Sequence, residues 1–295
     1  MSRLEQKVAI VTGAGSGVGK EHALLLASEG AQVVVNDIGE AANETVSNIK
    51  ANGGKAVSHI GSVSDWNTGE DLVSTALDNF GDLHILINNA GILRDAMSFS
   101  MSEQEFDEVI DVHLKGHFVC ARSAAIYWRN QSKAGKDSAR RMIHTTSESG
   151  LFGGPAQSNY ASAKGGILTL SLTLGRELSK YGVTTNVVAP RARTGLTDYI
   201  QSMAAPESKE EFDVYDPANV SPFVVWLCTD EAQDVTGQAF IVGGSGVWWM
   251  RSWSHINHIK LDSQRFSIDQ INAMKEELFQ GDDTGIPTFA APKFG

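Results

Sequence analysis

A glycine-rich loop near the start of the chain joins a short apolar run to an amphipathic segment. The run Val8–Thr12 leads into Thr-Gly-Ala-Gly-Ser-Gly-Val-Gly over residues 12–19, and residues 17–29 then carry apolar side chains at helical spacing. Glycines let a backbone turn tightly and approach a ligand closely. A second run of β-branched residues, Gln32–Asn36, completes a strand–helix–strand unit, which implies parallel strands joined by a right-handed crossover.

The same alternation continues along the first 245 residues. Five further strands are expected, at Ala56–Ile60, Ile85–Asn88, Met142–Thr145, Thr184–Ala189 and Ala239–Val242. Further helices are expected at 41–51, 65–80, 103–128 with a break near Leu114, 158–181 and 218–227. The pattern predicts an α/β fold class, a single Rossmann-type domain with a doubly wound, parallel, seven-stranded sheet and helices on both faces. We expect this domain to span residues 1–247, followed by a C-terminal extension over 248–295.

Charge and composition exclude several kinds of partner. The 295 residues include 24 Lys and Arg against 35 Asp and Glu, a formal net charge of −11, and a negative field repels the phosphates of nucleic acids. No apolar stretch approaches the roughly 18 residues of a membrane span, so no membrane association is expected. The two cysteines, Cys120 and Cys228, and the absence of a signal-peptide pattern predict reduced thiols and a cytoplasmic location.

The glycine loop and the end of the second strand together indicate a dinucleotide site. The loop opens into a helix N-terminus, so its N–H groups and the helix dipole favour a pyrophosphate. Asp37 ends the second strand about 20 residues later, where a carboxylate binds ribose hydroxyls and repels the 2′-phosphate of NADP. We therefore expect NAD, with NADP less favoured; a purely structural turn is the alternative. The expected loop contacts are Gly13, Gly15, Ser16, Gly17, Val18 and Gly19.

A tyrosine and a lysine in a later predicted helix form a candidate catalytic pair. Tyr160 and Lys164 are four residues apart, so their side chains share one helix face. An ammonium favours the phenolate form of a neighbouring phenol, which allows proton exchange at ordinary pH. Ser147 follows the preceding predicted strand, and its hydroxyl can bind a carbonyl or alcohol oxygen. Taken alone, such a Tyr–Lys pair is more often an ordinary surface pair. No metal site is expected.

In combination, these motifs resemble the short-chain dehydrogenase/reductase family over about residues 5–245. The resemblance rests on the glycine loop, on Asn88–Gly91 at a strand end, and on Ser147, Tyr160 and Lys164 in that order. It implies an NAD(P)-dependent oxidoreductase that interconverts a secondary alcohol and a ketone. Tyr160 would be the general acid/base, Lys164 would hold the nicotinamide ribose, and Ser147 would orient the reacting oxygen. Further cofactor contacts are implied at Ser62, Val63, Asn89, Ala90, Gly91, Pro190 and Thr194.

Three positions depart from the family pattern. His113 stands where the family usually has Asn, and its imidazole can support a proton relay to Lys164, although a structural histidine is the alternative. Ser62 replaces an Asp near the adenine and carries no charge. Arg191 replaces a Gly, and together with Arg193 it is expected to add positive potential beside the dinucleotide.

A narrower resemblance bears on the substrate. His113, Val35–Ile38, Asn89–Asp95 and Pro190–Thr194 are similar to the (3R)-hydroxyacyl-CoA dehydrogenase domains of peroxisomal multifunctional enzymes and their bacterial hydroxysteroid dehydrogenase-like relatives. This implies a bulky hydrophobic alcohol, such as a hydroxysteroid or a 3-hydroxyacyl-CoA, with terpene or aryl alcohols as alternatives. A dehydratase or epimerase and a non-catalytic NAD-sensing protein are less favoured.

The remaining expectations concern the cover of the site and the assembly. Residues Arg193–Asp216 have the composition of a mobile lid. The tail residues Trp248, Trp249, Met250 and Trp253 either cover a hydrophobic substrate or contact the core or a neighbouring subunit. By resemblance, the helices at 103–128 and 158–181 are dimer faces, which implies a homotetramer or a homodimer.

Overall fold

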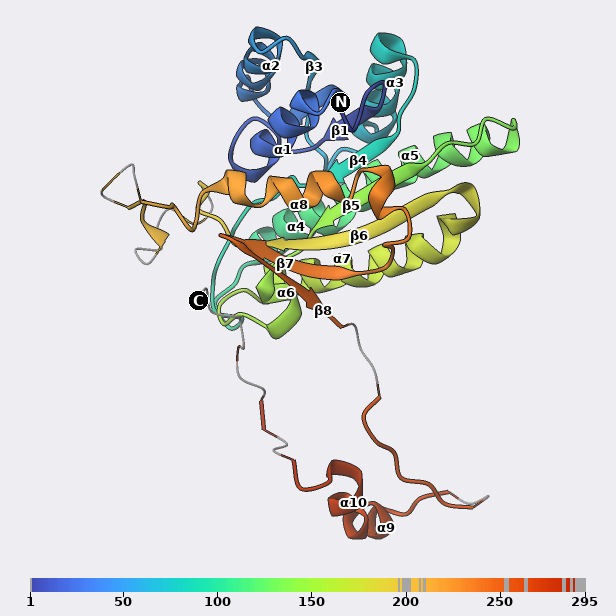
Figure 1. Ribbon diagram of the computed structural model, residues 1–295. Coiled ribbons are helices and arrows are strands. Elements are labelled where there is room, and N and C mark those ends of the chain that lie inside the picture. The colour runs from blue at the N-terminus through green and yellow to red at the C-terminus, as the bar shows by residue number, and fades with distance from the viewer. Residues whose placement is uncertain are drawn as a thin grey trace.

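The computed structural model describes residues 2–195, 197, 203–206, 208, 211–251, 255–262, 265–282, 285–286 and 289. Its centre is one eight-stranded sheet with the strand order β3-β2-β1-β4-β5-β6-β7-β8 (Figure 1). The strands from β1 to β7 are parallel, and the strand order reverses between β1 and β4. Ligands of open α/β sheets bind at such a reversal, outside the carboxyl ends of the strands.

The parallel strands lie where the apolar runs predict them. Both faces of the central strands are covered, so their residues are buried without alternation. Their bounds are β1 (Val8–Val11), β2 (Gln32–Asp37), β3 (Lys55–Ile60), β4 (Ile85–Asn88), β5 (Arg140–Thr145), β6 (Val183–Pro190) and β7 (Ala239–Gly243). The predicted doubly wound α/β domain is therefore confirmed.

Helices cover the two faces of the sheet and form a separate core on each. One face carries α1 (Gly17–Ser28), α2 (Ala41–Ala51) and α8 (Ser221–Trp226), and the other carries α3 (Thr68–Phe80), α5 (Gly116–Lys133) and α7 (Ser158–Leu178). The long helix predicted over 103–128 is α4 (Glu103–Ile110), a π-helical turn (Asp111–Lys115) and α5. The predicted break near Leu114 is this π-helical turn, and His113 lies within it.

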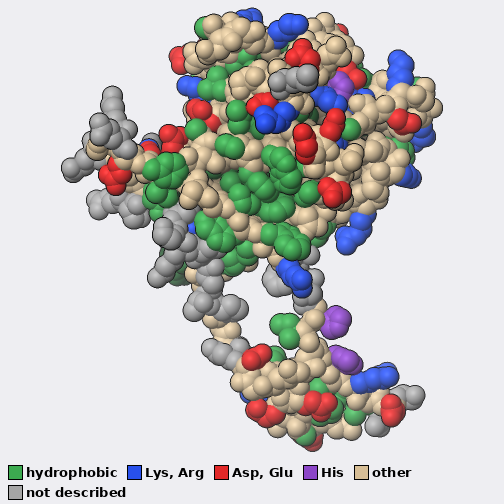
Figure 2. Space-filling view, viewed as in Figure 1, with side chains coloured by type: hydrophobic (Ala, Val, Ile, Leu, Met, Phe, Trp, Pro, Cys, Tyr) green, Lys and Arg blue, Asp and Glu red, His purple; other side chains and the backbone are tan. Residues whose placement is uncertain are grey.

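An eighth strand, β8 (Gly246–Met250), extends the sheet beyond the seven predicted strands. It pairs antiparallel with β7 and places Trp248 opposite Ile241. Because it is an edge strand, its residues alternate between half-buried and exposed positions instead of forming a continuous apolar run. The sheet thus continues past the expected boundary at residue 247. The side chains of Val247 and Trp249 are exposed. Apolar side chains also gather at the centre of the face of the domain that Figure 2 shows.

After β8 the chain leaves the body of the domain. It forms α9 (Ile268–Ala273) and α10 (Lys275–Phe279), which contact each other at a distance from the sheet (Figure 1). The end of the chain then returns, and Phe289 packs edge-on against Phe152 with 5.5 Å between ring centroids. Within the described ranges, no helix combines the length and apolar character that a membrane span needs. Trp253 lies outside the described residues.

Candidate active site

A cavity of about 550 Å³ opens at the carboxyl ends of the parallel strands, where the strand order reverses. It brings together residues that are far apart in the sequence, from the glycine loop at one end to Tyr160 and Lys164 at the other. Of the predicted site residues, all line this cavity except Gly15 and Gly19. Those that do are Gly13, Ser16, Gly17, Val18, Asp37, Ser62, Val63, Asn89, Ala90, Gly91, His113, Ser147, Tyr160, Lys164, Pro190 and Thr194.

Gly15 and Gly19 lie behind the cavity wall and shape the loop. The N–H of Gly15 donates a hydrogen bond to Oδ2 of Asp37 at 2.9 Å. A Cβ on Gly19 would lie 2.3 Å from the carbonyl oxygen of Gly13, so no larger residue fits there. Gly13 and Gly17 do line the cavity, and both have the positive φ that glycine adopts without strain.

Asp37 is held at the end of the cavity that the glycine loop lines. Its carboxylate accepts hydrogen bonds from the N–H groups of Gly15 and of Ile38, the latter at 2.7 Å. Its backbone carbonyl accepts from the N–H of Gly61, which brings β3 and the following loop alongside. Ser62 lies there too and pairs with Ser64, with 2.8 Å between their hydroxyl oxygens. The acidic side chain is therefore fixed by backbone groups and faces the cavity.

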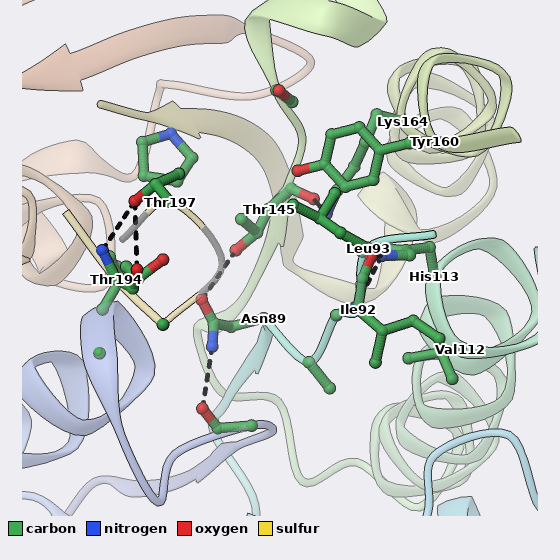
Figure 3. A pocket seen from close by; sticks show the side chains of 18 of the residues that line it. Asn89, Ile92, Leu93, Val112, His113, Thr145, Tyr160, Lys164, Thr194 and Thr197 are labelled. Carbon is green, nitrogen blue, oxygen red and sulfur yellow. Dashed lines mark hydrogen bonds between the residues drawn. The ribbon is translucent and has the colours of Figure 1, made fainter. Parts of the chain in front are cut away.

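Hydrogen bonds in both directions join the glycine loop to the residues that follow β4. Nδ2 of Asn89 donates to the carbonyl oxygens of Thr12 and Gly13, both at 3.1 Å. In return, the Thr12 hydroxyl accepts from the N–H groups of Asn89 at 2.9 Å and of Ala90 at 3.1 Å. In Figure 3, Asn89 lies between the loop and Thr145, to which it is also hydrogen-bonded. This reciprocal bonding gives a physical reason for Thr12 and Asn89 at these positions.

Tyr160 and Lys164 project from α7 toward the same region of the cavity (Figure 3). Nζ of Lys164 donates to the carbonyl oxygen of Thr145 at 2.7 Å and lies 5.6 Å from the centre of the Tyr160 ring. Burial lowers the pKa of the Lys164 ammonium to about 7. A negative charge beside Nζ, such as a phenolate on Tyr160, favours the protonated, charged form of Lys164. The pair is thus suited to hold and release one proton.

His113 faces Tyr160 from the π-helical turn. The two rings meet edge to face, with 5.1 Å between centroids. Nε2 of His113 lies 3.0 Å from the backbone nitrogen of Ile92 and 2.8 Å from its carbonyl oxygen. Burial, then the nearby Lys164 charge, hold the pKa of His113 well below its usual value, so the ring is neutral. A Cβ on Gly91 would lie 2.4 Å from the His113 ring, which explains the glycine there.

Ser147 caps the short helix α6 (Glu148–Phe152), and its hydroxyl accepts from the N–H of Ser149 at 3.2 Å. A chain of hydrogen-bonded polar side chains continues from Ser149. The Ser149 hydroxyl donates to Gln157 at 2.6 Å, and Gln157 donates to Asp95 at 3.0 Å. Ser149 and Gln157 line the cavity but were not predicted, although Gln157 lies just before Tyr160 in the sequence.

The expectation that Arg191 and Arg193 add free positive potential is wrong. Arg191 forms an ion pair with Glu148, and Arg193 forms one with Asp213, so both charges are compensated. Arg193 also donates to the carbonyl oxygen of Met203 at 2.9 Å. Met203 lines the cavity, as do Thr194, Gly195 and Thr197, so parts of the segment predicted to be a lid contribute to the cavity wall.

The chain is similar to proteins of known family. The family model described as short chain dehydrogenase matches residues 7–206. The chain is 40% identical over 95% of its length to "Hydroxyacyl-CoA dehydrogenase ChsB1" of Mycobacterium tuberculosis, of which it covers 90%. It is 38% identical over 84% of its length to mouse "Peroxisomal multifunctional enzyme type 2", of which it covers 33%.

A solved structure supports the same relationship over the whole chain. A short chain dehydrogenase from Mycobacterium avium superimposes with a TM-score of 0.87 at 43% identity, covering 98% of this chain and 100% of that one. The match includes the region beyond the sheet as well as the glycine loop and the Tyr160–Lys164 helix, since it spans nearly all of both chains. This protein therefore belongs to the short-chain dehydrogenase family, and is an oxidoreductase of that family.

Proposed function

We propose that this protein oxidises a secondary alcohol to a ketone with NAD, and catalyses the reverse reduction. One observation carries the proposal: Tyr160, buried Lys164 and Ser147 line the same cavity as the glycine loop and Asp37. A proton-transfer centre and a site shaped for a dinucleotide are thus contiguous. The family generally uses NAD or NADP; the choice of NAD is part of the proposal.

The residues present fit a dinucleotide. Helix α1 begins at Gly17, and the side chain of its N-cap residue, Ser16, makes no capping hydrogen bond. The Ser16 side chain therefore does not compete with an anion for the N–H groups of the first turn. Gly13, Gly17 and Val18 would hold the pyrophosphate, and Asp37 the adenosine ribose. When bound, NAD supplies a hydride acceptor at the nicotinamide end of the cavity.

The side chains of the protein would then control the proton. In the oxidation direction, the Tyr160 phenolate accepts the proton of the substrate hydroxyl as the carbon–hydrogen bond breaks. The Ser147 hydroxyl donates a hydrogen bond to the same oxygen and holds it in place. Lys164 stabilises the phenolate and directs an N–H toward the nicotinamide ribose. His113, neutral and next to Tyr160, would support the relay of the proton toward Lys164.

Asp37 provides the test of cofactor choice. Asp37→Ala removes a carboxylate that would accept hydrogen bonds from the ribose and repel a 2′-phosphate. We expect the ratio of kcat/KM with NAD to kcat/KM with NADP to fall by about 10-fold or more, as for the loss of a hydrogen bond to a charged group. Asp78→Ala, at an exposed position on α3, is the matched control and should leave the ratio unchanged. A wild-type protein that prefers NADP would contradict the proposed cofactor.

The proposed substrate is a bulky hydrophobic alcohol, with a 3-hydroxyacyl-CoA favoured. Support comes from the relative named as a hydroxyacyl-CoA dehydrogenase and from the apolar side chains of Leu93, Val112, Met203 and Phe289 around the cavity. NADH formation should be measured with 3-hydroxyacyl-CoA, hydroxysteroid, terpene and aryl alcohols. Turnover of one class identifies the substrate. NAD binding without turnover of any would instead favour the nucleotide-sensing alternative.

We further propose a homotetramer or homodimer. The predicted face on α5 exposes Phe118 and Ile126, and β8 and α8 expose Trp249 and Trp226. Apolar surface of this kind on a domain favours contact with a second copy. Light scattering on the purified protein should give a multiple of 31.7 kDa, and a monomer at micromolar concentration would contradict this proposal. A cytoplasmic location remains a prediction from the sequence.

A further inference from the structure

Arg191 joins three elements around the catalytic serine. It follows β6, and its backbone N–H donates to the carbonyl oxygen of Val242 on β7 at 2.7 Å. Its guanidinium forms an ion pair with Glu148, the first residue of α6, and lies over the Trp248 ring of β8, 5.4 Å from the centroid. The side chains of Arg191 and Glu148 are only 11% and 20% exposed, so water screens this pair weakly.

Glu148 occupies a position where a free negative charge would oppose the proposed chemistry. It follows Ser147 directly and lines the same cavity as Tyr160. The proposed reaction needs a phenolate on Tyr160 and develops negative charge on the oxygen that Ser147 holds. A nearby carboxylate disfavours both anions. A cation on Glu148 is therefore required at this point of the cavity.

The other charged groups do not supply that cation. Among the described residues that line the cavity, the cations are Lys164 and Arg191. Lys164 lies beside Tyr160 on α7, and its ammonium donates a hydrogen bond to the carbonyl oxygen of Thr145. His113 faces Tyr160 from the π-helical turn, but its ring is neutral. Two further carboxylates line or approach the cavity: Asp37 lies at its nucleotide end, and Asp95 is bonded to Gln157.

We propose that Arg191 is a positioning residue that neutralises Glu148 beside Ser147 and fastens α6 to β8, so that the serine stays oriented and Tyr160 can ionise. The inference rests on the proposed alcohol oxidation. This role also gives a physical reason for Arg191 at the position where the family pattern has a glycine. The guanidinium suits this task because its planar fork can bond a carboxylate while its face stacks on an indole.

The test is a pair of variants, Arg191→Met and Arg191→Met with Glu148→Gln. Arg191→Met removes the cation but keeps much of the side-chain volume. We expect kcat to fall by about 10-fold or more, and the acidic limb of the pH profile to move to higher pH by about one unit. NAD affinity, measured by titration, should change less than about twofold, because Arg191 is not assigned to the cofactor. The added Glu148→Gln removes the uncompensated carboxylate, so it should return the limb to its wild-type position and restore part of kcat. The loss of kcat that comes from unfastening α6 should remain in the double variant.

The outcomes separate this proposal from a structural role and from the proposed function. A double variant whose acidic limb stays shifted, or an unmoved limb in Arg191→Met, overturns charge neutralisation. Arg193→Met, which breaks the neighbouring ion pair with Asp213, is the matched control and should leave the limb in place. Amide hydrogen exchange over 147–152 should quicken in cofactor-free Arg191→Met, and unchanged exchange overturns the fastening of α6. If the wild type oxidises no alcohol, the proposed function fails instead, while the exchange result still stands.

Discussion

Replacing Tyr160 with Phe should reduce kcat by about 10³-fold, in the range that loss of a general acid/base produces. The substitution removes only the hydroxyl, so the ring can keep its edge-to-face contact with His113 at 5.1 Å. NAD affinity and the midpoint of thermal unfolding should change little for the same reason. The measurement is steady-state oxidation of whichever alcohol the screen identifies, with cofactor binding titrated in parallel.

A second phenol provides the control for this variant. Tyr181 lies in the turn after α7, does not line the cavity, and can also be changed to Phe. Tyr181→Phe should retain wild-type turnover. If Tyr160→Phe retained it as well, Tyr160 would not be the group that exchanges the proton, and the proposed mechanism would be wrong.

Replacing Lys164 with Met should lower kcat by about 10²-fold or more and weaken NAD binding. Two effects combine, because the ammonium is proposed both to favour the Tyr160 phenolate and to bind the nicotinamide ribose. The activity that remains should require higher pH, since the phenol loses its cationic neighbour. Lys136→Met, at an exposed position after α5, should change neither quantity. An unchanged pH profile in Lys164→Met would contradict the assigned role.

The same variant should alter how stability depends on pH. Burial lowers the pKa of Lys164 from 10.5 to about 7 in the folded protein, so between these values the unfolded chain binds the extra proton. The free energy of unfolding of the wild type therefore rises with pH across this window. Lys164→Met lacks this dependence, so its stability relative to the wild type should be highest below about pH 7 and decrease toward about pH 10. Urea unfolding at several pH values tests the sign, and a relative stability that increases with pH would contradict it.

The fold was largely predictable because its signals are local. Continuous apolar runs such as Val8–Thr12 and Gln32–Asn36 are typical of strands covered on both faces, and they alternate with segments of helical period. The break near Leu114 was also visible, although its π-helical geometry was not. Strand β8 was not predicted because the residues of this edge strand alternate between half-buried and exposed positions and form no continuous apolar run. Its tryptophans were therefore assigned to the C-terminal extension.

The site was predictable where residue type and spacing carry the chemistry. Tyr160, Lys164, Ser147 and Asp37 are recognisable from their motifs, and the cavity includes all four. Gly15 and Gly19 show the limit of this reasoning, because a glycine required for packing and a glycine that approaches a ligand look the same in sequence. Gln157 was missed because its role depends on contacts with Ser149 and Asp95 rather than on a motif.

The sequence by itself determined the α/β class, the glycine loop and the Tyr160–Lys164 pair, since each depends on neighbours within a few residues of one another. Only the tertiary structure decided which charges are compensated. Arg191 and Glu148 are 43 residues apart along the chain, and their ion pair exists because β6 ends beside the helix that follows β5. The energy of a charge depends on its distance to other charges and on its burial. These distances and this burial are set only when the strands assemble. The sequence therefore could not show that the two arginines, which were expected to attract a dinucleotide, are paired with carboxylates.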